Sequence, residues 1–421
     1  MDTPRMFRIR QIVEAPRVDN IERALNQTLD GADIDSKIKP GNRIAVTAGS
    51  RGIANIDAIL KHLVDRLKRA GARPFLIPAM GSHGGGTARG QQEVLDSLNI
   101  SEAATGAPVI SSMEVKKIGT SRFGFPVYVD RHAAEADGVV VVNRIKPHTE
   151  FEGSIESGLM KMMAIGLGNH KGCFAVHQQT VNYGYRHVVP EIGGRVLAAL
   201  PVLCGIGILE NVYDETAEIR AVLPADFMGV EQRLLKRAKK LMARLPFDAM
   251  DVLIVEEMGK NISGTGMDTN VIGRIMFVGE AEPERPKITR IVVLGLTEGA
   301  HGNAVGIGLA DFTTRALASQ IDHDALAVNA IAAMTPEKGR IPIAMETEEK
   351  AIAAALDTIG AVPPDKARIV RIKNTLELGE IEVSEPLLQK IEGREDLEVV
   401  EASGPLSFDA RGRLERRLYR S

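Results

Sequence analysis

The stretch GVVVVNRIKPHTEFEG, residues 138–153, decides the fold of the chain. Its first part, Gly138 to Val142, is β-branched apart from the glycine and shows no alternation of polar and apolar side chains. Such a run is typical of a strand that is covered on both faces, as in a parallel sheet. The polar segment that follows, Asn143 to Gly153, then lies beyond the carboxyl end of a strand, where open α/β sheets bind their ligands.

On both sides of this strand, short apolar runs alternate with amphipathic segments, which is the rhythm of βα units. Arg43 to Ala48 predicts a buried strand, Ile56 to Arg69 a helix with one apolar stripe, and Pro74 to Ala79 the next strand. Val252 to Glu256 and Ile288 to Leu296 predict two strands of the second half. The sequence therefore predicts an α/β protein.

The length of 421 residues exceeds what one core organises, since domains average roughly 150 residues. A basic helix predicted over Asp226 to Leu245 closes the first region. We predict two doubly wound α/β domains with a cleft between them. Residues 1–246 form the N-terminal, cofactor-binding domain and residues 247–421 the C-terminal domain. The arginine-rich last twenty residues are either a surface tail or a segment that returns to the first domain.

Composition excludes several classes of function. The 52 Lys and Arg residues against 55 Asp and Glu give a net charge of -3, which offers no basic footprint for nucleic acid. No apolar run approaches the roughly 20 residues of a bilayer span, so no membrane partner is expected. The chain starts without an apolar signal segment and has only two cysteines, which predicts a cytoplasmic protein.

Two loops that follow predicted strands in the first half carry candidate functional residues. Arg51, after the strand that ends at Ala48, can place two donors on a carboxylate or phosphate, or it is a solvated turn residue. In the loop from Met80 to Gly90, the glycines let the backbone approach a ligand closely. His83 in that loop is a candidate for acid–base chemistry, or it caps a helix.

The densest set of candidates follows the strand that ends at Val142. His148 lies in its loop, and Lys161 follows thirteen residues later in an apolar, methionine-rich segment. An apolar setting favours the neutral amine and makes Lys161 a candidate nucleophile or covalent anchor. The alternative is a helix lysine whose charged end reaches solvent.

A third histidine, His177, follows sixteen residues after Lys161 and forms a cluster with His170 and Cys173. A structural zinc site normally needs four ligands, so one imidazole on a metal otherwise held by a small molecule fits this cluster better. In the second half, Lys260 lies in a glycine-rich loop and is a candidate for holding a substrate carboxylate. Its alternative role is that of a surface lysine.

The type and order of these residues resemble the N-terminal domain of the nickel-dependent lactate racemase family. The resemblance covers residues 40–210 well and residues 250–420 only loosely. It implies two α/β domains and a nickel-pincer nucleotide, which is nickel held by pyridinium-3,5-bisthiocarboxylic acid mononucleotide. It also implies cofactor-biosynthesis enzymes as partners and a small hydroxy acid as substrate.

Roles follow from the resemblance position by position. Lys161 is similar to the lysine that tethers the cofactor, His177 to the nickel ligand, and His83 and His148 to the acid–base pair. The remaining positions that the resemblance implies are Arg51 at cofactor and substrate, Gly84, Gly85 and Ser154 at the cofactor, and Lys260 at the substrate carboxylate.

The implied reaction is racemisation or epimerisation of a 2-hydroxy acid by reversible hydride transfer. Removing the α-hydrogen as a proton leaves a poorly stabilised carbanion, whereas a metal-activated pyridinium can accept hydride. Imidazoles on opposite sides of the substrate can take and return the hydroxyl proton. Nickel(II) in square-planar coordination suits sulfur and carbon donors with one neutral imidazole.

Two departures from the family pattern concern the substrate. The residues Thr47 to Ser50 before Arg51 include no acid, and the chain contains no tryptophan to line a methyl pocket. Both favour a larger or more polar 2-hydroxy acid than lactate, such as a sugar acid or a dicarboxylate. The alternatives are a lysine-dependent lyase or isomerase without nickel, and a non-catalytic protein that binds a small organic acid or the cofactor.

Overall fold

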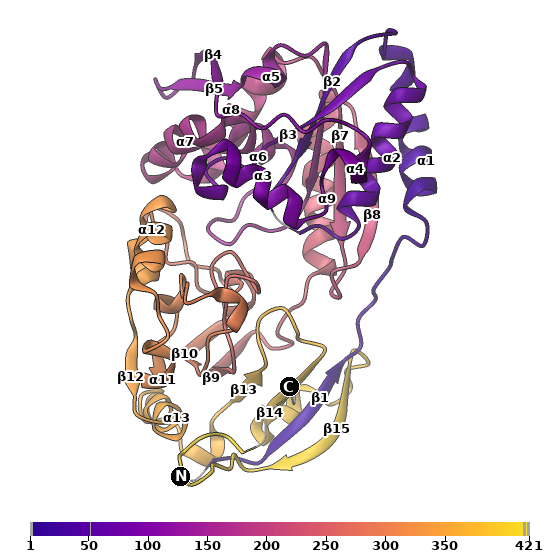
Figure 1. Cartoon of the computed structure of the whole chain (residues 1–421). Coiled ribbons are helices and arrows are strands. Elements are labelled where there is room, and N and C mark those ends of the chain that lie inside the picture. The colour runs from indigo at the N-terminus through magenta and orange to yellow at the C-terminus, as the bar shows by residue number, and fades with distance from the viewer. Residues whose placement is uncertain (1–2, 51, 416–417, 419–421) are drawn as a thin grey trace. The chain divides into compact units, whose positions relative to one another are not determined.

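The computed structural model describes residues 3–50, 52–415 and 418 (Figure 1). The chain folds into two compact units. The N-terminal unit is Ala15–Met242, and the C-terminal unit combines residues 1–14 with residues 243–421. Residues 1–14, which we expect from the sequence in the first domain, instead belong with the end of the chain.

The N-terminal unit is built on a five-stranded sheet with the order β3-β2-β6-β7-β8. The first four strands in this order are parallel, and β8 runs antiparallel to β7. A separate two-stranded sheet consists of β4 and β5. The strand bounds are β2 (Arg43–Ala48), β3 (Arg73–Pro78), β4 (Val115–Thr120), β5 (Pro126–Asp130), β6 (Gly138–Arg144), β7 (Val202–Glu210) and β8 (Thr216–Val222).

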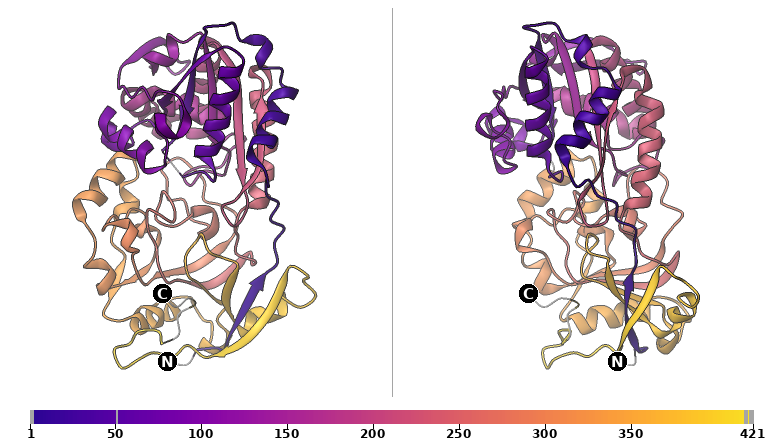
Figure 2. Two further views of the ribbon diagram at one scale, coloured as in Figure 1. Left: turned by 45° about the vertical axis from the view of Figure 1, so that its right-hand side comes forward. Right: turned by 90° about the vertical axis from the view of Figure 1, so that its right-hand side faces the viewer.

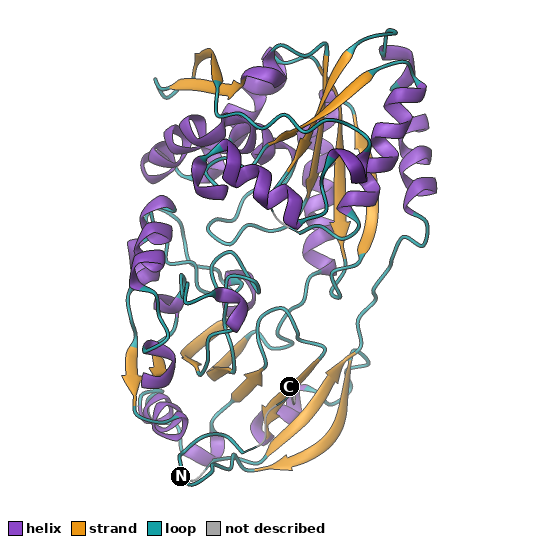
Figure 3. Ribbon diagram, in the orientation of Figure 1, coloured by secondary structure: helices purple, strands orange, loops and turns teal. Residues whose placement is uncertain are grey.

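Helices cover both faces of this sheet (Figure 3). Helices α1 and α2 contribute to one core with β2, β6 and β7, while α6 and α9 pack on the other face. The helix bounds are α1 (Ile21–Gly31), α2 (Ile56–Arg69), α3 (Ala88–Ser97), α4 (Glu102–Thr105), α5 (Arg131–Ala134), α6 (Leu159–Ala164), α7 (Asn169–Tyr183), α8 (Tyr185–Ala199) and α9 (Phe227–Leu241).

Glycines in β7 let the helices on this second face approach the sheet. A Cβ atom at Gly205 would lie 2.5 Å from Leu159 of α6 and 2.8 Å from Phe227 of α9. Because real Cβ atoms do not approach other atoms so closely, a larger residue would push both helices away. The spacing between β7 and α6, and therefore the position of Lys161, depends on this glycine.

Most elements predicted from the first half are confirmed. The strand Arg43–Ala48 and the helix Ile56–Arg69 have the predicted bounds, and the strand predicted from Gly138 extends to Arg144. The basic helix is shorter than predicted, because Met242 already has extended backbone. The α/β class is confirmed.

The C-terminal unit contains an eight-stranded mixed sheet with the order β12-β11-β10-β9-β13-β14-β1-β15. The first five strands in this order, from β12 to β13, are parallel. The pairs β13–β14, β14–β1 and β1–β15 are antiparallel. The strand bounds are β1 (Met6–Gln11), β9 (Ala249–Val255), β10 (Lys287–Val293), β11 (Phe312–Thr314), β12 (Ile343–Met345), β13 (Ile369–Ile372), β14 (Glu380–Ser384) and β15 (Leu397–Gly404). The helices are α10 (Thr269–Ile272), α11 (Arg315–Ala318), α12 (His323–Ala332) and α13 (Glu348–Asp357).

Strand β1, from the start of the chain, lies beside β15 from its end (Figure 2). On its other side β1 pairs with β14, so that Met6 lies opposite Ser384. The first strand therefore completes a sheet whose other strands all come from the second half of the chain. The described part of the arginine-rich tail also belongs to this unit, because Leu414 N donates to Glu348 and Leu418 N donates to Glu256.

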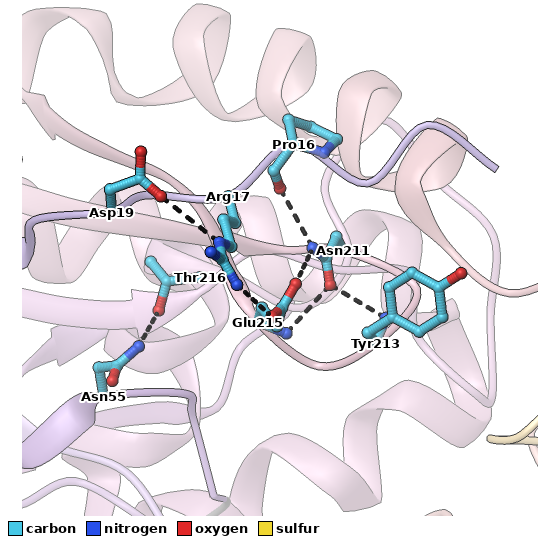
Figure 4. A network of polar contacts seen from close by, with 8 residues as sticks. All are labelled: Pro16, Arg17, Asp19, Asn55, Asn211, Tyr213, Glu215 and Thr216. Atoms are coloured by element: carbon cyan, nitrogen blue, oxygen red, sulfur yellow. Dashed lines mark hydrogen bonds and ion pairs between the residues drawn. The ribbon is translucent and has the colours of Figure 1, made fainter.

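A polar network fastens the N-terminal unit where the chain enters it (Figure 4). Buried Asn211, in the turn between β7 and β8, donates to the carbonyl of Pro16 and to the Glu215 carboxylate. Its side-chain oxygen accepts from the backbone N–H groups of Tyr213 and Glu215. Arg17 completes the network with an ion pair to Glu215. One side chain thus joins the β7–β8 turn to the entering segment.

The helices of the described residues are all too short or too polar to cross a lipid bilayer.

Candidate active site

The loop that follows β6, residues 145–158, is held in place by a buried carboxylate. Glu156 accepts hydrogen bonds from the backbone N–H of His148 at 2.7 Å and of Gly153 at 3.2 Å. Lys239 of α9 forms an ion pair with it at 2.8 Å. Burial raises the pKa of Glu156, and the Lys239 ammonium and the backbone donors oppose this effect. The backbone position of His148 therefore depends on an acid that the sequence pattern does not single out.

The imidazole of His148 is held on both nitrogens. Its Nδ1 accepts a hydrogen bond from the backbone N–H of Glu150 at 3.1 Å. Its Nε2 lies 2.5 Å from Nζ of Lys161. The ring packs against Phe151 and Tyr185, with centroids 4.7 Å and 5.5 Å apart. The predicted acid–base residue and the predicted covalent anchor are thus in direct contact.

Lys161 projects from α6, whose other residues from Leu159 to Ala164 are all buried. The N-terminus of this short helix is capped from α9, because Met160 N donates to the carboxyl of Glu231 at 3.0 Å. Glu231 is fully buried, and burial raises its pKa to about 8 although the backbone donors of Met160 and Leu159 lower it. Helix α6 is therefore anchored by one side chain from a neighbouring helix.

His177 lies on α7 and contacts two residues of the site. The thiol of Cys173, one turn earlier, lies 3.9 Å from its Nδ1, and the ring of Tyr185 meets it edge-on at 6.0 Å. Burial lowers the pKa of His177, whereas Cys173 and the Glu150 carboxylate raise it. The net result is a pKa above the usual value for histidine. Since Cys173 occupies Nδ1, Nε2 is the nitrogen that can bind a metal.

Lys161 also acts on His177, because a positive charge on its amine lowers the pKa of that histidine. This coupling requires the two groups to be near one another. The tethering and metal-binding candidates therefore share one region of the N-terminal unit.

His83 lies on the loop after β3 and is exposed. Its Nδ1 forms a hydrogen bond with Ser50, which follows β2. The preceding residue, Ser82, is contacted by the thiol of Cys173 at 3.7 Å. Because β3 and β6 flank β2 in the sheet, His83 and His148 follow strands on either side of the same central strand. The His83 loop is thereby connected to the helix of His177.

The glycines of this loop differ in what surrounds them. A Cβ atom at Gly84 would lie 2.5 Å from the backbone of Gly90 and Gln91, and φ of Gly84 is +64°. Both the positive φ and the close backbone atoms therefore favour glycine at this position. Gly85 has φ of +65° and open space around it, so its backbone is available to a ligand.

The structure joins four of the predicted residues through a series of direct contacts. The series runs from Ser50 and His83 through Ser82 and Cys173 to His177, and then through Tyr185 and His148 to Lys161.

The remaining predicted positions are not part of this series. Ser154 is exposed on the β6 loop. Lys260 lies in the C-terminal unit, where its Nζ donates to Asn329 of α12 at 2.6 Å. Arg51 is outside the described residues. His170 packs against Phe174, so the second histidine of the sequence cluster has a different neighbour from His177.

Sequence reasoning missed several residues that organise the site. Tyr185 stacks on Phe151 at 4.8 Å and donates a hydrogen bond to the Glu150 carboxylate at 3.3 Å. Burial raises its pKa well above the usual value, so the phenol keeps its proton. In the sequence, Tyr185 is marked only by its position next to Gly184, the residue that separates α7 from α8. Glu231 gave no signal, because one acid in an amphipathic helix reads as a surface residue.

The fold and the site together define an α/β protein with a lysine–histidine centre beyond the carboxyl ends of a parallel sheet. Residues 5–187 match the family model of the lactate racemase N-terminal domain. This part of the chain is therefore similar to that domain, which confirms the resemblance stated from the sequence. The matched segment contains the four predicted residues that the contact series joins, His83, His148, Lys161 and His177.

The structure is also similar to a solved structure, the lactate racemase apoprotein from Thermoanaerobacterium thermosaccharolyticum. The similarity covers 86% of this chain and 93% of that chain, with a TM-score of 0.53 and 12% sequence identity. At this identity the similarity shows a shared fold. None of the curated proteins matches the sequence.

Proposed function

We propose that the protein is an isomerase that racemises or epimerises a 2-hydroxy acid with a nickel-pincer nucleotide tethered to Lys161. The observation that carries this proposal is the contact series from His83 to Lys161. It gathers two imidazoles for proton transfer, one amine for a covalent link and one imidazole for a metal within a lactate racemase N-terminal domain.

The donor set of the site suits such a group. Among the described residues, no three His, Cys, Asp or Glu side chains gather as ligands of a metal ion. His177 with its Nε2 nitrogen is then a single protein ligand, which fits a metal whose other donors belong to an organic molecule. Cys173 on Nδ1 orients the ring, as outer partners of metal-binding histidines commonly do.

When bound, the nucleotide supplies an acceptor for hydride from the substrate carbon and returns it. The residues of this chain handle protons and position. His83 and His148 take the hydroxyl proton on one side of the substrate and give it back on the other. Arg51 and Lys260 hold the substrate carboxylate, and the backbone at Gly85 and the side chain of Ser154 border the nucleotide. The proposal also includes cofactor-biosynthesis enzymes as partners of the protein and the cytoplasm as its location.

The proposed substrate is larger or more polar than lactate. The loop before Arg51 carries no acid, and the chain carries no tryptophan to line a pocket for the methyl group of lactate. A sugar acid or a dicarboxylate is the expected class. Among a panel of 2-hydroxy acids, epimer analysis should show faster turnover of these than of lactate.

The tether is tested by intact-mass measurement after co-expression with enzymes that make the cofactor. Wild type and Lys236→Ala, a change at an exposed lysine of α9, should gain the mass of the nucleotide with nickel, and Lys161→Ala should not. An unmodified wild-type protein would contradict the proposal. It would favour a lysine-dependent lyase or isomerase without nickel, or a binding protein.

The acid–base pair is tested by turnover of the loaded protein. General acid–base groups contribute roughly 10²–10⁴-fold, so His83→Ala and His148→Ala should each lower kcat by at least about 100-fold. Substrate binding without turnover in the loaded wild type would instead assign a binding function.

A further inference from the structure

The hydrogen bonds around His148 determine where its proton lies. Nδ1 faces the backbone N–H of Glu150 at 3.1 Å, and a peptide N–H can only donate. Nδ1 must therefore be the unprotonated nitrogen. A stable imidazole then carries its proton on Nε2, because an imidazole without any proton does not occur near neutral pH.

The position of this proton determines the state of Lys161. Nε2–H of His148 points at Nζ of Lys161 from 2.5 Å. An ammonium has three donors and no acceptor, so it cannot receive this hydrogen bond. Only the neutral amine has the lone pair that the geometry requires. The contact therefore selects the nucleophilic form of Lys161.

Other groups around Lys161 act in both directions. A nearby carboxylate would favour an ammonium by charge, and Glu150, whose backbone N–H contacts His148, accepts a hydrogen bond from the phenol of Tyr185 at 3.3 Å, which disperses its charge. His177 on α7 interacts electrostatically with Lys161, and a protonated His177 disfavours a second cation. The carboxyl of Glu231 contacts the backbone at the start of α6. The apolar neighbours in α6 disfavour an ammonium as well.

We propose that His148 holds Lys161 as a neutral amine for the capture of an electrophilic ligand carbon, and that this capture releases Nε2 of His148 for proton transfer with substrate. The inference rests on the proposed function and adds an earlier role for the same histidine. It assigns the tethering step to residues of this chain and requires no additional base.

The capture is a condensation that balances without an oxidant or reductant. Nζ of Lys161 forms a bond to an acyl-type carbon of the ligand, and a carbon–oxygen bond of that carbon breaks. The oxygen leaves as water with one proton from the amine and one from the acid group. The nitrogen becomes an amide-type N–H whose lone pair is delocalised, so it no longer accepts from His148 Nε2. Nε2 of His148 then no longer donates to Lys161 and can serve the substrate hydroxyl.

The test is reductive methylation of the full-length, cofactor-free protein with formaldehyde and cyanoborohydride, followed by peptide mass spectrometry. Formaldehyde is small and reacts only with neutral amines. At pH 7 we expect Lys161 to react at least about tenfold faster than exposed Lys236 of α9. Its half-maximal rate should also occur at least about one pH unit lower. A rate for Lys161 that rises with pH in parallel with Lys236 would overturn the inference.

The role of His148 is tested by His148→Ala and His148→Asn. Both variants should slow methylation of Lys161 about tenfold at pH 7 and leave Lys236 unchanged. His187→Gln, at an exposed histidine of α8, should change neither rate. If Lys161 reacts equally fast without His148, the inference fails. The wild-type pH profile remains decisive if the variants do not fold.

The two proposals fail in different ways. A His148-dependent reactivity of Lys161 in a protein that never gains the nickel adduct would leave this inference standing and remove the proposed function. If the nickel adduct forms normally but the reactivity of Lys161 does not depend on His148, the proposed function stands and this inference fails.

Discussion

Buried acids have different partners in the two units. In the N-terminal unit, Glu156 and Glu231 accept hydrogen bonds from the backbone of the His148 loop and of the Lys161 helix. In the C-terminal unit, Glu382 forms an ion pair with Arg371 of β13 at 2.9 Å. Asp251 forms an ion pair with Arg368, the residue just before β13, at 2.6 Å. The first pair of acids positions functional segments, and the second joins neighbouring strands.

This difference predicts which property each acid controls. Removing a partner from the C-terminal pairs should destabilise a sheet and leave the site chemistry unchanged. Altering the N-terminal acids should change the reactivity of Lys161 or His148 as well as stability. The following substitutions test the contrast.

The largest effect is expected for Arg371→Met. The Arg371 side chain is almost fully buried and lies between Glu256 at 3.4 Å and Glu382 at 2.9 Å. Its loss leaves two buried carboxylates without their cation, which typically costs about 3–5 kcal/mol. Hydrogen exchange measured by mass spectrometry should show faster opening of β13 and β14, with Lys161 methylation unchanged.

Arg368→Met is the matched control, because the Arg368 side chain is 36% exposed. A pair with this exposure contributes about 1 kcal/mol or less. An effect of Arg371→Met no larger than that of Arg368→Met would show that burial of the pair does not decide its contribution.

The next effect is a pH dependence carried by Glu231. Its pKa is about 8 in the folded protein against 4.5 for an ordinary glutamate, so the folded chain keeps a proton that the unfolded chain releases. This group therefore stabilises fully below pH 4.5, and its contribution disappears as the pH rises through 8. The loss by pH 9 is on the order of 4 kcal/mol.

Glu231→Gln should remove this loss, since the amide does not titrate. Urea unfolding at pH 5 and pH 9 measures it: the variant and wild type should differ little at pH 5, and the variant should be more stable at pH 9. Parallel pH profiles for the two proteins would contradict a raised pKa.

A smaller effect is expected for Glu156→Gln. The amide cannot pair with Lys239 and offers one acceptor oxygen where the carboxylate serves two backbone donors. One unmatched buried donor costs about 1–3 kcal/mol, and the His148 loop should exchange its amide protons faster. Glu152→Gln, at an exposed partner of the same Lys239, should stay within about 0.5 kcal/mol of wild type. Equal effects of the two changes would indicate that only the ion pair matters.

The sequence predicted the elements that local pattern defines. Runs without alternation gave the strand at Arg43–Ala48, and one apolar stripe gave the helix at Ile56–Arg69. The rule that ligands bind beyond strand ends selected His83 and His148 before any geometry was known. An apolar setting and a His–Cys cluster singled out Lys161 and His177. The resemblance to a family then implied their particular roles, which remain predictions.

Other features depend on contacts between distant residues and left no local signal. The pairing of β1 with β14 joins residues 370 positions apart, such as Arg10 and Glu380. The cap on α6 comes from Glu231 of α9, seventy-one positions from the N–H it accepts. Tyr185 matters because it stacks on Phe151, and nothing in either local sequence indicates that contact.

The position of β1 has a consequence for biosynthesis. This strand leaves the ribosome before the whole of the N-terminal unit, whereas its neighbours β14 and β15 are translated after that unit. The N-terminal unit, Ala15–Met242, can fold on the nascent chain before the partner strands of β1, Met6–Gln11, have been synthesised. The eight-stranded sheet can close only after β14 and β15 have been synthesised, so a translation product that stops before β14 would display β1 without its partner strands.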